Sequence, residues 1–105
     1  MMMKISGIEW DDGNWPKCGK HGLSQAEIEH ALQHMTFNIP DPNPAEPRLR
    51  TAARTQDGRP VFIVYMHRER EDGTYLRPIS ARYMHRKEIE HYERIEKAMA
   101  DPANR

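Results

Sequence analysis

Residues 57–82 read DGRPVFIVYMHREREDGTYLRPISAR and set the architecture of the chain. This segment holds two tight-turn pairs, Asp57-Gly58 and Asp72-Gly73, each followed by residues with strand character. We therefore predict strands over 59–68 and 74–82, joined as an antiparallel hairpin. The run VFIVYM inside the first strand is long and apolar, which is typical of a central strand with both faces covered.

The segments before this hairpin complete the expected sheet. Residues 48–55 are weakly apolar and precede the first turn pair, so we expect an edge strand that forms a second hairpin. Residues 5–10 are expected to form a short opening strand. Residues 38–47 contain four prolines in ten positions, which excludes a helix or a central strand and predicts a surface loop.

Two helices are expected to pack on one face of this sheet. The first begins with Ser24 as N-cap and Glu27 three residues later, a capping box, and runs from about 24 to 36 with one apolar stripe. The second runs over 84–100, again with apolar residues at helical spacing. The predicted fold class is α+β, with an antiparallel sheet of three to four strands and two or more helices packed on it.

Length and composition bound the class of protein. The 105 residues are expected to form one domain, 1–105, with 101–105 as a disordered tail. The single cysteine, Cys18, allows no intramolecular disulfide, which fits a reducing compartment. No run of about 18 apolar residues occurs, and the N-terminus lacks the apolar stretch of a signal peptide. We therefore expect a cytoplasmic protein without a membrane partner.

The formal net charge of zero hides an asymmetry along the chain. Residues 48–87 carry ten basic and four acidic side chains, and nine of the ten basic residues are arginines. Arginine suits bidentate contacts with phosphate and stacking on bases, so we favour a polyanionic partner. The alternative is that these arginines only keep a short sheet soluble.

Two other kinds of site compete with phosphate binding. The spacings Cys18-x2-His21 and His30-x3-His34 suit a zinc finger, but only eight residues separate the two pairs, and the helical histidines lie opposite the apolar stripe. We favour two exposed histidines over a zinc-dependent adaptor. A Cys18 nucleophile, activated by nearby cations, has no other sign of acyl chemistry beside it. We therefore predict no metal and no cofactor.

Three segments resemble the BrnT family, in the same order and with compatible gaps. They are EWDDGNWPKCGKHGLSQAEIEHAL (9–32), DGR with VFIVYMHR (57–68) and RPISARYMHRKEIEHYE (77–93), which together cover about half of the chain. The resemblance implies a RelE-like fold and metal-independent cleavage of RNA that inhibits translation and growth. It also implies a cognate BrnA-like antitoxin. The protein would contact DNA only indirectly, through this antitoxin.

The resemblance further implies a set of site residues. The catalytic candidates are Lys20, Arg68, Arg82, His21 and His85. The basic stretch 48–87 adds Arg59, Arg77, Arg86 and Lys87 as RNA-binding candidates. In the implied mechanism the RNA 2′-hydroxyl attacks the adjacent phosphate, and Arg68 and Arg82 offset the developing negative charge. Lys20 holds a phosphate oxygen, and His21 or His85 moves a proton.

A second hypothesis, from a different class, stays open beside the ribonuclease. It is a non-catalytic relative that binds RNA or protein with the same fold and leaves RNA intact. Whether Arg68 and Arg82 meet depends on the register of the hairpin, which the sequence leaves open. Apolar residues of the sheet that the helices leave uncovered are the expected docking site of the antitoxin.

Overall fold

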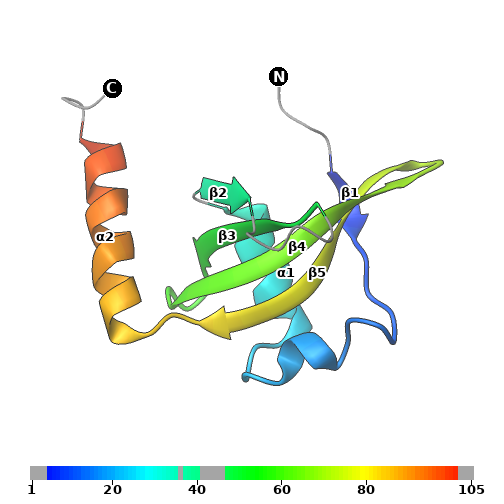
Figure 1. The fold of residues 1–105 in the computed structure, drawn as a ribbon, viewed down its shortest axis with the longest axis horizontal. Helices are drawn as coiled ribbons and strands as arrows, with labels where there is room; N and C mark the ends of the chain where they lie inside the picture. The colour runs from blue at the N-terminus through cyan, green and yellow to red at the C-terminus, as the bar shows by residue number, and fades with distance from the viewer. Residues whose placement is uncertain (1–4, 36, 41–46, 102–105) are drawn as a thin grey trace.

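The computed structural model of the chain describes residues 5–35, 37–40 and 47–101, and this part contains one mixed sheet in the strand order β1-β5-β4-β3-β2 (Figure 1). The strands are β1 (Ile5–Ile8), β2 (Phe37–Pro40), β3 (Leu49–Arg54), β4 (Pro60–Arg70) and β5 (Gly73–Tyr83). The helices are η1, a 3-10 turn (Lys17–Gly19), α1 (Gln25–Gln33) and α2 (Arg86–Ala100). No helix in this described part is long and apolar enough to cross a membrane.

The two hairpins that the turn pairs predict are both present. β3 pairs antiparallel with β4, and β4 pairs antiparallel with β5. Gly58 and Gly73 occupy the turns with φ of 86° and 142°, a region that residues with a side chain rarely adopt. These two turns therefore require glycine, and this is why the short motifs predict the hairpins correctly.

A bulge interrupts the long ladder between β4 and β5. Val64 pairs with Ser80, but the next residue, Tyr65, pairs with Pro78, so Ile79 is the extra residue on β5. Proline has no N–H to donate to a neighbouring strand, and a bulge is one of the few internal positions that accept it. The bulge shifts the alternation of β5, which decides which of its side chains face each side of the sheet.

Helix α1 covers one face of the sheet and forms the main core with it. Its predicted capping box is confirmed: Ser24 Oγ accepts a hydrogen bond from the Glu27 N–H (3.1 Å), and the Glu27 carboxylate accepts one from the Ser24 N–H (2.9 Å). Buried side chains of the helix pack with alternate residues of β4. These are Ile28, Ala31 and Leu32 of α1 and Val61, Ile63 and Tyr65 of β4.

Helix α2 packs against the opposite face, and in Figure 1 it stands beyond the end of β5 while α1 lies behind the sheet. Its Tyr92 is 2% exposed and belongs to a small cluster with Ala52 and Phe62. Along β3 and β4 these two residues alternate with Ala53 and Val61, which belong to the α1 core. The prediction that both helices pack on one face is therefore wrong. The apolar residues of α2 pack on the other face of the same strands.

Strand β3 lies inside the sheet, so the prediction of an edge strand over 48–55 is wrong. Residues 51–53 are buried because their small side chains lie between two paired neighbours and under the two helices. The edge is β2 instead, which takes residues 38–40 from the predicted loop, and an edge position tolerates proline. Residues 41–46 of that loop lie outside the described part of the chain.

Strand β1 makes the sheet larger than the three to four strands expected. It pairs parallel with β5, through Ile5 with Thr74 and Ile8 with Leu76. No turn motif marks a parallel partner that is far away in the sequence, so this pairing has no local signal. The predicted tail lies outside the described residues apart from Asp101, whose N–H donates to the carbonyl oxygen of Ala98.

Candidate functional site

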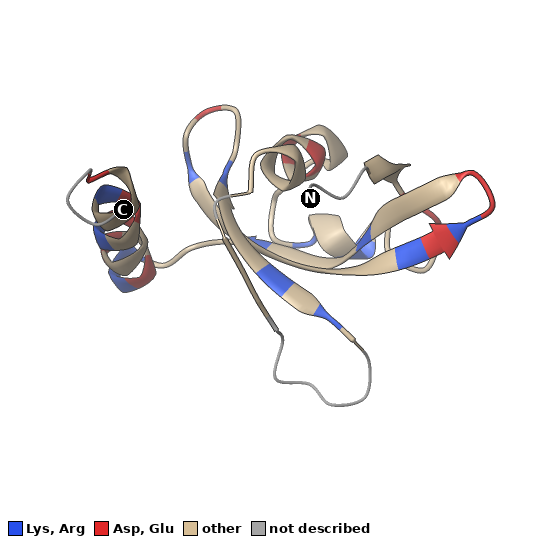
Figure 2. Ribbon diagram, turned by 90° about the horizontal axis from the view of Figure 1, so that it is seen from above, with Lys and Arg blue, Asp and Glu red and all other residues tan. Residues whose placement is uncertain are grey.

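The sheet face opposite α1 is partly open. Phe62, Val64 and Met66 of β4 lie on it and are only half-buried, so the prediction that both faces of this strand are covered is wrong. Among the described elements, α2 covers this face at one end. Lys and Arg form bands along the strands in Figure 2, while α2 carries both signs of charge. We call this surface the open face.

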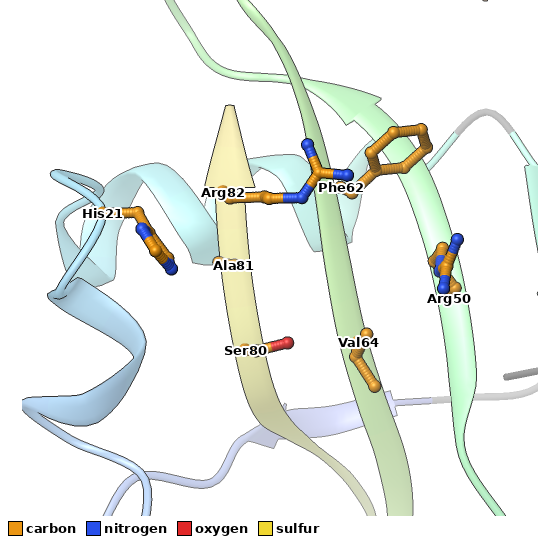
Figure 3. Close-up of a pocket in the computed structure, with 7 residues that line it drawn as sticks. All are labelled: His21, Arg50, Phe62, Val64, Ser80, Ala81 and Arg82. Atoms are coloured by element: carbon orange, nitrogen blue, oxygen red, sulfur yellow. The ribbon is translucent and has the colours of Figure 1, made fainter. Parts of the chain in front are cut away.

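A first cavity, of about 200 Å³, lies in the middle of the open face (Figure 3). The register explains why its residues meet, because Val64 pairs with Arg50 on one side and with Ser80 on the other. His21 comes from the loop after η1 and lies beside β5. The lining residues are His21, Arg50, Phe62, Val64, Ser80, Ala81 and Arg82.

Two arginines flank one aromatic ring at this cavity. The guanidinium carbon of Arg82 lies 5.1 Å from the centre of the Phe62 ring, and that of Arg50 lies 5.9 Å from it. A cation over a ring face is attracted by the ring quadrupole. The ring therefore favours positions in which both positive charges stay over the open face, where an anion can approach them.

Glu88 of α2 holds Arg82 in place. The two terminal nitrogens of Arg82 donate to the two carboxylate oxygens of Glu88, each at 2.9 Å, and the Arg82 guanidinium also donates to the carbonyl oxygen of Tyr83 (3.2 Å). The hydrogen bonds from Arg82, with a further one from the His85 N–H, lower the pKa of Glu88 to about 2. The same contact raises the pKa of Arg82, so both groups stay charged at neutral pH.

A second cavity, of about 220 Å³, lies further along the open face. At this cavity the Arg77 guanidinium donates to both carboxylate oxygens of Asp11, at 2.6 and 3.0 Å, and to Glu9 at 3.3 Å. The bond from Arg77 also lowers the pKa of Asp11. Arg68 is held more loosely, with its Nε 3.9 Å from the Glu9 carboxylate. The lining residues are Gly13, Asn14, Lys17, Arg48, Met66, Arg68, Arg77 and Ile79.

The structure places Arg68 and Arg82 in different cavities. Arg82 pairs with Phe62 near one end of the ladder between β4 and β5, whereas Arg68 pairs with Tyr75 near the other. The two pairs are six positions apart along β4, about 20 Å at roughly 3.3 Å per residue. The register that the sequence left open thus separates the two arginines.

Lys20 and His85 do not line the first cavity. Lys20 immediately precedes His21, but it is exposed and lines a different hollow, beside Trp15. His85 is exposed at the start of α2, and its N–H donates to the Glu88 carboxylate that holds Arg82 (2.8 Å). Of the five residues predicted as catalytic, His21 and Arg82 are the two that share the first cavity.

The four predicted RNA-binding residues lie in separate places. Arg59 is exposed and stacks on Tyr83, with its guanidinium carbon 3.6 Å from the ring centre. Arg77 lines the second cavity, and Arg86 is exposed on the first turn of α2. Lys87 lines an apolar groove between α2 and the sheet.

This apolar groove, of about 540 Å³, adjoins the first cavity and shares Arg50 and Phe62 with it. Its walls are mostly apolar side chains from β2, β4 and α2. The lining residues are Phe37, Ile39, Arg50, Phe62, Lys87, Glu88, His91, Tyr92 and Ile95.

Several residues of the two cavities were missed as site residues from the sequence. The basic ones are Arg50 in the first cavity and Lys17 and Arg48 in the second. A signal for the two arginines was present, because they stand at alternate positions of one strand and must therefore face the same side. No comparable pattern marks Lys17, which reaches the sheet through the turn of η1.

The competing sites find little support in the geometry. Burial raises the pKa of the Cys18 thiol, which disfavours the thiolate that a nucleophile needs. His30 and His34 stack on each other with ring centres 4.2 Å apart. Among the described residues, no group of three His, Cys, Asp or Glu side chains is placed to hold a metal ion.

Cationic side chains gathered in cavities on an open sheet face define a protein suited to phosphate-rich ligands. A sequence model of the family described as "Ribonuclease toxin, BrnT, of type II toxin-antitoxin system" matches residues 10–88. The chain therefore belongs to the BrnT family of ribonuclease toxins, and a type II toxin has an antitoxin partner. None of the curated proteins matches the chain. The matched range contains the whole first cavity and ends at Glu88, the partner of Arg82.

Proposed function

We propose that this chain is a metal-independent endoribonuclease that acts in the cytoplasm, cleaves RNA and thereby inhibits translation and growth. We also propose a RelE-like fold and neutralisation by a BrnA-like antitoxin, which supplies all contact with DNA. The observation that supports cleavage at the first cavity is that His21, Arg50 and Arg82 converge there from three different segments. This set combines a proton carrier with two cations, which is what phosphodiester cleavage needs.

The proposed reaction is an attack of the RNA 2′-hydroxyl on the adjacent phosphorus. The bond from the 2′-oxygen to phosphorus forms while the bond from phosphorus to the 5′-oxygen breaks, which gives a 2′,3′-cyclic phosphate and a 5′-hydroxyl. The imidazole of His21 takes the proton of the 2′-hydroxyl, and water or His85 supplies one to the leaving 5′-oxygen. Arg82 and Arg50 offset the charge that builds up on the phosphate oxygens. Lys20, the neighbour of His21 in the chain, holds a phosphate oxygen.

The pairing of Arg82 with Glu88 is compatible with this role. A guanidinium has five N–H groups, and three of those on Arg82 donate to Glu88 and Tyr83. Two therefore remain for a phosphate oxygen. Because Glu88 fixes the direction of the guanidinium, the ion pair presents Arg82 to the cavity in one orientation, and preorganised donors are the most effective ones in catalysis.

The second candidate function, RNA binding without cleavage, is favoured by the same ion pair in another respect. A carboxylate beside Arg82 reduces the positive charge that a transition state would meet. Such a chain would bind RNA through its arginines and leave it intact.

The antitoxin is proposed to bind the apolar groove. An antitoxin segment with apolar side chains for the groove and acidic side chains for Arg50 and Lys87 would complement both its walls and its charge. Because Arg50 and Phe62 also line the first cavity, a segment bound there would block access to the proposed cleavage site.

A growth experiment tests the proposed function. Wild type, Arg82→Ala and His21→Ala are induced in bacteria without the antitoxin, with Lys97→Ala on the exposed surface of α2 as the control. We expect wild type and the control to arrest growth with loss of RNA, and the two cavity variants to allow growth. If all four chains accumulate in folded form and none arrests growth, the ribonuclease proposal fails and the binding function replaces it.

A further inference from the structure

The second cavity lies on the same face of the sheet as the first. Val64 lines the first cavity, and Met66 and Arg68, two and four residues further along β4, line the second. These intervals correspond to about 7 and 13 Å along the strand. A few nucleotides of single-stranded RNA cover such a span, so one strand can lie across both cavities.

The charges of the second cavity favour an anion. Four cationic side chains line it, and two of them, Arg68 and Arg77, contact the carboxylates of Glu9 and Asp11. The cations are Lys17, Arg48, Arg68 and Arg77. Arg77 is 12% exposed and held by both carboxylates, so it forms a fixed floor rather than a mobile contact.

Two of the cations remain accessible to a ligand. The Arg68 side chain is 44% exposed, and its Nε lies 3.9 Å from the Glu9 carboxylate, beyond hydrogen-bond distance. Lys17 is exposed on η1 and has no ion pair with another described residue. Both side chains can therefore take a phosphate oxygen without breaking a hydrogen bond that holds the fold.

We propose that the second cavity is a phosphate-binding subsite that holds the RNA backbone a few nucleotides from the bond that is cut. This proposal rests on the proposed function, since it names a further contact for the same substrate. Lys17 and Arg68 bind the phosphate, and Arg77 with Asp11 positions the loop that carries Lys17. Arg68 then acts in substrate binding and not at the reacting phosphate.

The test compares a short and a long RNA substrate on the full chain. The short one is a dinucleotide that fills only the first cavity, and the long one extends it by six nucleotides on each side, with the same bond cut. We expect wild type to cleave the long RNA with the higher kcat/KM. Lys17→Gln and Arg68→Gln should lower kcat/KM at least about tenfold more on the long substrate than on the short one, as expected for the loss of a charged hydrogen bond. Lys97→Gln is the control of equal charge change.

Salt dependence gives a second readout. Each lost phosphate contact should reduce the slope of log affinity against log salt by about 0.7 for single-stranded RNA. If both variants lower kcat/KM equally on the two substrates, or leave the slope at its wild-type value, the subsite is refuted. If wild type cleaves neither substrate, the proposed function fails instead. The salt slope on uncleaved long RNA then decides the subsite by itself, with a reduced slope supporting it and a wild-type slope refuting it.

Discussion

Arg82 on β5 and Glu88 on α2 form a two-point ion pair, with both terminal nitrogens of the arginine 2.9 Å from the carboxylate oxygens. This pair joins the proposed cleavage site to helix α2, whose Tyr92 packs in the same cluster as Phe62. The ion pair thereby links the position of α2 to the orientation of Arg82, so a substitution of Glu88 is expected to affect both.

Replacement of Glu88 by glutamine should strengthen RNA binding. The variant removes a negative charge beside Arg82 and keeps the size of the side chain. Because the pair is partly exposed, we expect a gain of at most about fivefold in affinity, equivalent to about 1 kcal/mol or less. Fluorescence anisotropy with a labelled RNA measures it. Glu90→Gln, the same charge change two residues away on α2, serves as the control, and an equal gain in both variants would contradict a specific effect on Arg82.

Acid should destabilise the fold over a pH range that the pKa of Glu88 determines. Its pKa in the folded chain is about 2, against an ordinary value of 4.5. A carboxyl group with a lowered pKa contributes stability that is complete above its unfolded pKa and is lost as pH falls through the folded one. The free energy of unfolding should therefore decrease from about pH 4.5 to pH 2, as measured by urea denaturation. Asp11, Glu27 and Glu96 act in the same direction. An equally steep decrease in Glu88→Gln would show that this group is not responsible.

Replacement of Ile39 by glutamate should separate antitoxin binding from cleavage. Ile39 is 45% exposed in β2 and lines the apolar groove, but it does not line the first cavity. A charge placed there disfavours an apolar partner, so we expect at least a tenfold loss of antitoxin affinity by calorimetry. RNA cleavage by the purified variant should stay at the wild-type rate. Unchanged antitoxin affinity would exclude the groove as the docking site.

Replacement of Ile63 by alanine should destabilise the domain without touching the open face. Ile63 of β4 is fully buried in the core with α1, and truncation of such a residue costs about 2–5 kcal/mol. Chemical denaturation gives this value. Phe62→Leu is a useful comparison, because the neighbouring residue faces the other side of the sheet and should affect Arg82 and α2 instead. A loss below about 1 kcal/mol for Ile63→Ala would contradict the described core.

The sequence predicted those parts of the fold that have local causes. The two glycine turns and the capping box of Ser24 each specify a conformation within a few residues, and all three are present. The parallel pairing of β1, the internal position of β3 and the placement of α2 on the opposite face depend on contacts between distant segments. Local sequence patterns do not indicate such contacts. The parallel pairing of β1 was therefore not predicted, and the positions of β3 and α2 were predicted wrongly.

The candidate site divides in the same way. His21 and Arg82 were named from the resemblance to the BrnT family, and the structure places both at one cavity. The partners Arg50 and Phe62 come from neighbouring strands, and only the register of the sheet reveals them. The register also separates Arg68 from Arg82, which the order of residues along the chain could not decide.

The decisive measurement is cleavage of a defined RNA by the purified chain in the presence of EDTA, with analysis of the product ends. We predict cleavage that EDTA does not reduce, with 2′,3′-cyclic phosphate and 5′-hydroxyl ends. Loss of one oxyanion-stabilising donor, in Arg82→Ala, should lower the rate about 10²- to 10³-fold. Intact RNA with folded wild-type protein, or full activity of Arg82→Ala, would contradict the proposed cleavage site.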